Sequence, residues 1–176
     1  MIGGGAWCES IIGAAKRIGF QGDIRPVHPS GKQIAGIASL PSLDAWSGPL
    51  DAAFIGVNRH ATLDVVAELA AKGAGGAICF ASGFAEAGAE DTQAEDLQSQ
   101  LVSNAGDMPI LGPNCYGFIN ALDHVAIWPD QHGMVPVDTG VAILTQSSNI
   151  AINMTCLLYT SPSPRDQRGS RMPSSA

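Results

Sequence analysis

The chain has 176 residues, of which 45% are hydrophobic and 14% are charged. Its 16 acidic and 9 basic residues give a formal net charge of −7, which argues against nucleic acid or an anionic membrane as the main partner. The four cysteines are scattered and no run of 18 apolar residues occurs, so we expect a cytoplasmic protein in a reducing setting that does not enter a membrane.

Strand-like and helix-like segments alternate from the start of the chain. Met1-Ile2 and the following glycines resemble the last residues of a strand and the turn after it, which predicts a first strand that begins upstream of this sequence. Apolar residues at helical spacing predict a helix over 8–18 that ends at Gly19. Further helices are expected at 42–46, 62–71 and 92–105, and strands at 23–27, 52–57, 76–80 and 108–111.

This alternation with short loops predicts an α/β fold, a Rossmann-like, doubly wound parallel sheet with right-handed crossovers, over residues 1–120. Residues 121–138 lack periodicity and are expected to form a linker. Val141–Thr145 is typical of another buried strand, and Ile150–Met154 of an apolar helix start. We therefore expect a second domain to begin within 139–155.

The composition changes after Thr155. Residues 156–166 and 170–176 resemble the in-frame translation of a common transposon sequencing adapter, and Gln167-Arg168-Gly169 falls where a sample barcode would be read. We expect 156–176 to be a non-native, disordered tail without functional residues, because it has too little apolar area to offset the entropy of ordering.

The segment Gly3-Gly4-Gly5-Ala6-Trp7, between a strand and a helix, is a candidate phosphate-binding loop. Glycine allows the backbone to approach a ligand closely, and a helix N-terminus offers N–H donors and positive potential. The match to G-x-G-x-x-G is partial, since Cys8 stands where the third glycine belongs. A tight turn that simply needs small residues is the alternative.

The loop after the second strand distinguishes between nucleotides. Proteins that bind NAD place an acidic residue there to hold the ribose diol, whereas His28–Lys32 has no acid and one cation, Lys32. A cation suits a phosphorylated ribose, as in NADP or coenzyme A; an ordinary solvated lysine is the alternative. The other strands end in small or polar residues without an acid/base set for hydride transfer, which favours coenzyme A: Asn58-Arg59-His60, Ser82-Gly83 and Asn114-Cys115.

The strand Met108–Leu111 runs directly into a rigid turn, Gly112–Gly117, which carries one small thiol. Ligands of open α/β sheets sit at the carboxyl ends of strands, so Asn114 and Cys115 are candidates for an active-site loop. No His or Asp is placed by sequence to activate Cys115 as a nucleophile. The four histidines have no metal-like spacing with the cysteines, so we expect no metal site.

Residues 1–155 resemble the CoA-binding domain of the NDP-forming acyl-CoA synthetases (the ADP-forming acetate–CoA ligase family), relatives of the succinyl-CoA synthetase alpha subunit. The most specific features are a Gly-Phe-x-Glu segment followed by a Gly-Pro-Asn-Cys segment. The segments that carry the resemblance are Gly3-Gly4-Gly5, Gly19–Ile24, Pro26–Pro29, Ala81–Glu86, Gly112–Gly117 and Thr145–Ser148.

The resemblance implies a Rossmann-like domain that holds coenzyme A, followed by a flavodoxin-like domain. It places Gly5, Ala6 and Trp7 along the nucleotide or pantetheine, and Lys32 near the 3′-phosphate. It also implies that Ser147 and Ser148 hold phosphate for a phosphohistidine, although Ser148 departs from the usual glycine. The residues implied to line the pantetheine arm are Ala81, Ser82 and Gly83; Glu86 either caps the turn at Gly83 or faces the substrate.

The implied reaction is that of an ATP-dependent acid–CoA ligase: phosphate passes from ATP to histidine and then to the acid, and the thiol of CoA attacks the acyl phosphate. The resemblance also implies a carboxylic acid substrate, ATP with Mg²⁺, an ATP-grasp domain or subunit, and an oligomeric intact protein. The histidine and the ATP-binding domain lie outside this sequence, so no catalytic residue is expected here. An NADP-binding oxidoreductase or redox-sensing module, and a CoA-binding regulatory region of a protein acetyltransferase, are the alternatives.

Overall fold

The computed structural model describes residues 1–160, and its centre is a parallel sheet. The strands β3 (Ala53–Ile55), β4 (Ala77–Cys79) and β5 (Ile110–Leu111) pair in that order, all parallel. Isolated parallel bridges join Ile2 to both Ile55 and Val27, and Val27 to Leu40. Across the sheet the order is therefore Leu40, Val27, Ile2, β3, β4, β5, which is the 3-2-1-4-5-6 order of doubly wound nucleotide-binding sheets.

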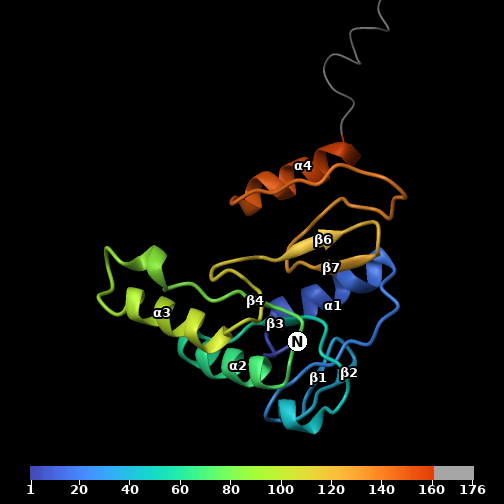
Figure 1. The fold of residues 1–176 in the computed structure, drawn as a ribbon. Helices are drawn as coiled ribbons and strands as arrows, with labels where there is room; N and C mark the ends of the chain where they lie inside the picture. Colours follow the sequence, from blue (N-terminus) through green and yellow to red (C-terminus); the bar gives the residue numbers. More distant parts are fainter. Residues whose placement is uncertain (161–176) are drawn as a thin grey trace, which may run out of the picture.

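Helices cover both faces of this sheet, as Figure 1 shows. On one face α1 (Ala6–Ile18) packs its apolar side, including Ile12, against Phe54 and Ile78. On the other face lie α2 (Arg59–Ala71) and α3 (Ala94–Ala105), packed against Ile55 and Cys79. Adjacent strand residues face opposite sides, so both faces are buried. The predicted α/β class with a parallel sheet is confirmed, and the three main helices lie within three residues of their predicted starts.

Two antiparallel hairpins flank the sheet and were not predicted. The hairpin β1 (Gln33–Ile34) and β2 (Ile37–Ala38) turns through Ala35 and Gly36, both at positive φ, a geometry that suits a two-residue hairpin loop. Short 3-10 helices lie at Leu43–Ala45 (η1), where a helix over 42–46 was expected, and at Ala85–Ala87 (η2).

The second hairpin joins β6 (Phe118–Asn120) to β7 (Val125–Ile127), so a strand that was not predicted lies within 121–138, the segment expected to form a linker. The Asn120 side chain accepts hydrogen bonds from the N–H groups of Leu122 and Asp123 and closes the turn. Ala126 is buried against Ala14 and Ile18 of α1. The strands are too short for their alternation to stand out in the sequence, which explains the missed prediction.

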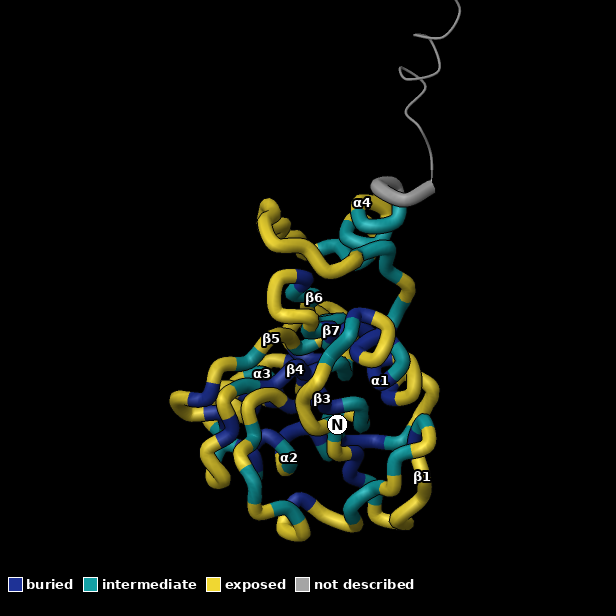
Figure 2. The backbone as a smooth tube through the Cα atoms, turned by 90° about the vertical axis from the view of Figure 1, so that its right-hand side faces the viewer, coloured by how far each residue is buried: buried dark blue, intermediate teal, exposed yellow. Residues whose placement is uncertain are grey.

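The strand predicted at Val141–Thr145 is wrong: this segment has no regular structure, and Val141 and Leu144 are 92% and 93% exposed. A strand needs a hydrogen-bonding neighbour, and no described segment pairs with this one. Figure 2 shows the contrast between the buried sheet and this exposed stretch of chain before α4.

Helix α4 (Ser148–Thr160) contains the predicted helix start and continues through residues 156–160, which were predicted to be disordered. No glycine or proline interrupts the sequence between Ser148 and Pro162, so nothing in the backbone chemistry stops the helix earlier. The prediction of a disordered tail for 161–176 lies outside the described residues. Within the described residues, no helix is both long enough and apolar enough to cross a membrane.

Candidate functional site

Five loops follow the carboxyl ends of the parallel strands and therefore meet at one edge of the sheet. The glycine loop (Gly3–Gly5) follows Ile2, and the histidine loop (His28–Lys32) follows Val27. The Gly83 turn (Ala81–Gly83) follows β4, and the cysteine loop (Gly112–Gly117) follows β5. The fifth loop leads from β3 to the start of α2.

The three glycines of the glycine loop have different reasons to be glycine. Gly3 has φ +121°, and a Cβ there would lie 2.6 Å from the carbonyl oxygen of Gly56. A Cβ on Gly4 would lie 2.6 Å from Lys32 Cε. Gly5 has an ordinary φ of −91° and a Cβ on it would meet nothing within 4 Å. Packing thus explains Gly3 and Gly4, whereas Gly5 faces open space.

Helix α1 starts directly after Gly5, its N-cap residue, which has no side chain to accept the first N–H groups of the helix. The first N–H groups of a helix have no intrahelical acceptor, which leaves those of Ala6 and Trp7 available at the helix start, next to Gly5. Oriented N–H groups and the helix dipole make such a site favourable for an anion.

Lys32 lies at this same loop. Its exposed Nζ donates a hydrogen bond of 2.6 Å to the carbonyl oxygen of Gly4, and an ammonium group has further donors available. The structure therefore brings together the predicted residues Gly5, Ala6, Trp7 and Lys32, although Lys32 and its partner Gly4 are 28 positions apart in the chain.

A row of aromatic rings connects the glycine loop with the cysteine loop. The Trp7 ring, 45% exposed, lies 5.2 Å from Phe80 and 6.4 Å from Tyr116 between ring centroids. Tyr116 in turn contacts Trp128 at 5.4 Å, and Phe54 lies 5.6 Å from Phe80. Half of the chain's ten aromatic residues gather in this aromatic row, and sequence reasoning singled out only Trp7. Their scarcity was one available signal, and the positions of Phe80 and Trp128 directly after β4 and β7 were another.

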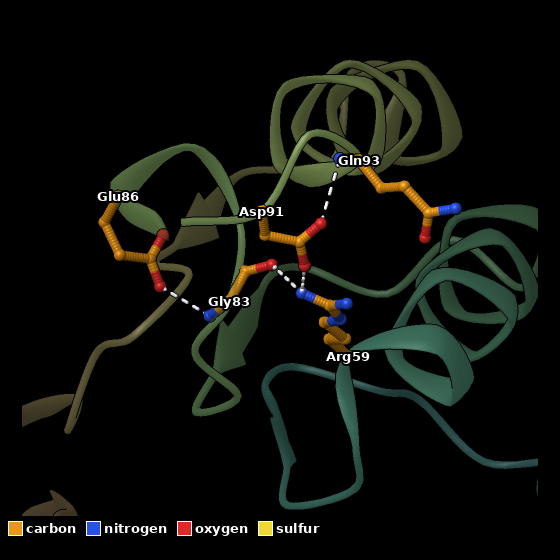
Figure 3. A network of polar contacts seen from close by, with 5 residues as sticks. All are labelled: Arg59, Gly83, Glu86, Asp91 and Gln93. Carbon is orange, nitrogen blue, oxygen red and sulfur yellow. Dashed lines mark hydrogen bonds and ion pairs between the residues drawn. The ribbon is translucent and has the colours of Figure 1, made fainter. Parts of the chain in front are cut away.

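The Gly83 turn is held from both sides by charged side chains, as Figure 3 shows. Arg59 Nη1, at the start of α2, donates to the Gly83 carbonyl oxygen at 2.8 Å and to the carboxylate of Asp91. The Gly83 N–H donates to Glu86 Oε1 at 2.8 Å. Of the two roles considered for Glu86, the structure shows the cap of the Gly83 turn. Both backbone groups of Gly83 are therefore already used within the protein.

Asp91 joins this network to the start of α3. Its Oδ1 accepts the backbone N–H of Gln93 at 2.9 Å. That N–H, and secondarily the Arg59 guanidinium, hold the pKa of the Asp91 carboxyl below its usual value. Sequence reasoning noted Arg59 only as a polar strand end and missed Asp91. Their pairing depends on residues 32 positions apart, and no local pattern reports it.

The cysteine loop is tied to β4 and to the Gly83 turn. The N–H of Asn114 donates to the Ala81 carbonyl oxygen at 2.9 Å, and that of Cys115 to the Cys79 carbonyl oxygen at 3.2 Å. The predicted residues Ala81, Asn114 and Cys115 are therefore neighbours. Burial raises the pKa of the Cys79 thiol to about 12, which keeps it protonated and unsuited to nucleophilic attack.

Ser147 and Ser148 stand apart from these loops. The Ser147 hydroxyl oxygen accepts the N–H of Ile150 at 3.3 Å, and the Ser147 N–H donates to Thr145 Oγ1 at 3.0 Å. These bonds cap the start of α4, which Figures 1 and 2 both draw beyond the β6–β7 hairpin. The structure gives no contact between these serines and the loops of the sheet edge.

The geometry of this edge agrees with a match to known proteins. A family model described as a CoA binding domain matches residues 5–121, which include the glycine loop's last residue, Lys32, the Gly83 turn and the cysteine loop. The chain belongs to this family of CoA binding domains. It is related to the ADP-forming acetate–CoA ligases, as the resemblance drawn from the sequence implied.

The curated relatives are much longer than this chain. A trans-feruloyl-CoA synthase, FCS1, from an unknown prokaryotic organism is 27% identical over 158 residues, which are 88% of this chain and 22% of the relative. The ADP-forming acetate–CoA ligase II of Archaeoglobus fulgidus is 33% identical over 111 residues, which are 63% of this chain and 16% of the relative. The chain thus spans about a fifth of the length of these relatives.

A solved structure supports the same relationship. The dinucleotide-forming acetyl-coenzyme A synthetase 1 of Candidatus Korarchaeum cryptofilum is similar to this chain in its apo form and in its complex with phosphate and ADP. Each comparison gives a TM-score of 0.61 and 27% identity, covering 68% of this chain and 25% of the other.

Proposed function

We propose that this chain is the CoA-binding part of an ATP-dependent, ADP-forming acid–CoA ligase. The whole protein would convert a carboxylic acid, CoA and ATP into acyl-CoA, ADP and phosphate through a phosphohistidine that lies outside these residues. The family match over 5–121 supports CoA as the ligand. The names of the relatives, which are CoA ligases and synthases, support the reaction class.

The observation that carries the proposal is the open glycine loop with its lysine. Gly5 leaves space, α1 offers free N–H groups, and the Lys32 ammonium lies 2.6 Å from the Gly4 carbonyl oxygen. A ligand with a diphosphate and a ribose phosphate fits such a loop, because both donors and charge are present. The chain as a whole carries a net charge of −7, whereas this loop carries the cation Lys32. The local positive charge favours an anionic ligand there.

The residues around this loop would have separate tasks. Gly5, Ala6 and Trp7 would lie along the nucleotide or pantetheine, and Lys32 would meet the 3′-phosphate. Ala81 and Ser82 would line the pantetheine arm, and Gly83 would hold the shape of the turn, since its own N–H and C=O are occupied. Asn114 and Cys115 would form the adjacent wall of the active-site loop. When bound, CoA supplies the thiol that receives the acyl group.

The rest of the reaction needs parts that this chain does not contain. We propose that Ser147 and Ser148 hold phosphate for the histidine of a following domain, where the N-terminus of α4 would offer N–H donors. The carboxylic acid, ATP with Mg²⁺, and an ATP-grasp domain or subunit complete the proposed assembly.

Calorimetric titration of the chain with CoA, dephospho-CoA and NADPH tests the proposal. We expect CoA to bind more tightly than dephospho-CoA by about 1.5–3 kcal/mol, roughly 10- to 150-fold, because the 3′-phosphate makes a charge-assisted contact with Lys32. Lys32→Ala should remove that difference. The matched control is Lys16→Ala. Lys16 is an exposed lysine in the last turn of α1, away from the glycine loop, and it donates to the Ala35 carbonyl oxygen. This variant should keep the difference in affinity between CoA and dephospho-CoA.

Each other result has a clear meaning. If wild-type chain binds CoA and dephospho-CoA equally, the role of Lys32 is wrong, while CoA binding stands. Tighter binding of NADPH than of CoA would favour the NADP-binding alternative. No binding of CoA at millimolar concentration would reject the proposed function.

A further inference from the structure

The side chain of His28 lies over the glycine loop, and neither the family match nor the proposal above gives it a role. It directly follows Val27, which bridges Ile2 in the sheet. A Cβ added to Gly4 would lie 3.0 Å from His28 Nε2 and 2.6 Å from Lys32 Cε. The imidazole and the lysine stem therefore share the space over Gly4, next to the open space at Gly5.

The neighbouring serine fixes which ring nitrogen carries the proton. The backbone N–H of Ser30 donates to His28 Nδ1 at 3.2 Å, and the Ser30 hydroxyl oxygen lies 2.8 Å from the same atom. A backbone N–H can only donate, so Nδ1 is an acceptor. In the neutral imidazole the proton must then be on Nε2.

The Nε2–H group has no hydrogen-bond acceptor among the described side chains and backbone of residues 1–156, and it lies on the side of the ring that faces Gly4. A ring held by two contacts at Nδ1 presents this donor in a fixed direction. Lys32, beside it, adds a positive charge. The two side chains thus form a donor pair at the position where NAD-binding proteins place an acceptor for the ribose diol.

We propose that His28 is a ligand-binding residue whose Nε2–H donates to the ribose 3′-phosphate of CoA alongside Lys32. This inference rests on the proposed function, because it concerns the same site. It adds a specificity residue: a rigid imidazole donor and a lysine together favour a phosphorylated ribose over a free diol, and the Ser30 contact sets the direction of the donor.

Two substitutions separate the two ring nitrogens. In His28→Asn, the side-chain oxygen can still accept the Ser30 N–H, but no donor reaches the Nε2 position. In His28→Gln, the longer amide can place an N–H near the Nε2 position. We expect His28→Asn to weaken CoA binding about tenfold and His28→Gln less than threefold, with dephospho-CoA unaffected by either. The control is His124→Asn, in the β6–β7 turn at φ +58°, a conformation that Asn tolerates; it should change neither affinity.

Wild-type affinity of His28→Asn for CoA would overturn the inference, and so would an equal loss for CoA and dephospho-CoA, since that would indicate a general effect on the loop. A ¹⁵N NMR titration of wild-type chain keeps the test valid if His28→Asn does not fold. The His28 Nε2 resonance should shift with CoA and not with dephospho-CoA, and equal shifts would count against the inference. If the wild-type chain does not bind CoA at all, the proposed function fails. That result differs from one in which the wild-type chain binds CoA and substitution of His28 has no effect.

Discussion

The glycine loop and the Gly83 turn lie at the same edge of the sheet, yet their backbones are used in opposite ways. In the glycine loop, Gly5 faces open space and the following helix N–H groups are free. In the Gly83 turn, Glu86 accepts the N–H and Arg59 donates to the C=O, so both groups are satisfied within the protein. A glycine at the ligand-binding edge of a sheet can therefore have one of two roles: it can leave room for a ligand, or it can allow a turn to close on itself.

The charges follow the same division. Arg59, next to the Gly83 turn, is paired with Asp91. Lys32, next to the glycine loop, forms no ion pair with any side chain of residues 1–156, and its ammonium group donates to the neutral carbonyl of Gly4. An anionic ligand therefore gains more at the glycine loop than at the Gly83 turn, and substitutions at the two loops should affect different properties.

Within the glycine loop, Gly3→Ala should have the largest effect on stability. A Cβ at φ +121° is strained, and at 2.6 Å from the Gly56 carbonyl oxygen it forces the first strand away from β3. We expect the free energy of unfolding to fall by about 3 kcal/mol, measured by urea unfolding. A loss below about 0.5 kcal/mol would contradict the assigned steric role.

Gly5→Ser is the matched substitution two residues later. Serine is at least as good a helix N-cap as glycine and meets no neighbour here, so stability should change by less than about 0.5 kcal/mol. CoA affinity should nevertheless fall about tenfold, because the hydroxymethyl group occupies the space open to the ligand. Unchanged affinity in the calorimeter would mean that the ligand does not approach Gly5.

The parts of the site that the sequence could predict depend on backbone rules. Parallel strands bring their carboxyl ends to one edge, so Gly5, Lys32 and Asn114 could be placed near one another from strand positions alone. The aromatic row and the Arg59–Asp91 pair could not, because they depend on side chains that meet only after α2, α3 and the β6–β7 hairpin are packed. Val141–Thr145 failed as a strand for a related reason: its apolar pattern is strand-like, but no described segment pairs with it.

At the Gly83 turn, Arg59→Met should loosen the loop without removing a ligand contact. The variant keeps the apolar stem but leaves the Gly83 carbonyl oxygen and the part-buried Asp91 carboxylate without their donor. We expect a loss of about 1 kcal/mol in stability and faster amide hydrogen exchange over residues 82–92. CoA affinity should stay within about threefold of wild type, and a larger loss of affinity would place Arg59 in contact with the ligand.

The control for this variant is Lys72→Met. Lys72 pairs with Asp44 at 2.7 Å, but the Asp44 side chain is 83% exposed. A surface ion pair contributes about 0–1 kcal/mol, and the exposure of Asp44 places this pair at the low end, so Lys72→Met should lose clearly less stability than Arg59→Met. Equal losses for both variants would indicate that the Arg59 network is no more than a surface ion pair.

The smallest expected effect is a pH dependence at Asp91. Its carboxyl has a lowered pKa in the folded chain, first because of the Gln93 N–H and then because of Arg59. A lowered folded pKa means that the carboxylate stabilises the fold above its ordinary pKa of about 3.9, and that this contribution is lost as the pH falls through the lowered value.

Urea unfolding of wild type and Asp91→Asn should therefore show a difference in the free energy of unfolding near pH 7, and this gap should narrow below about pH 4. Other titrating groups are common to both proteins and cancel in the difference. A gap that stayed constant down to about pH 3 would show that the Asp91 charge does not hold the Gly83 turn, and the contrast between the two loops would then depend on the direct contacts of Arg59 and Glu86 with Gly83.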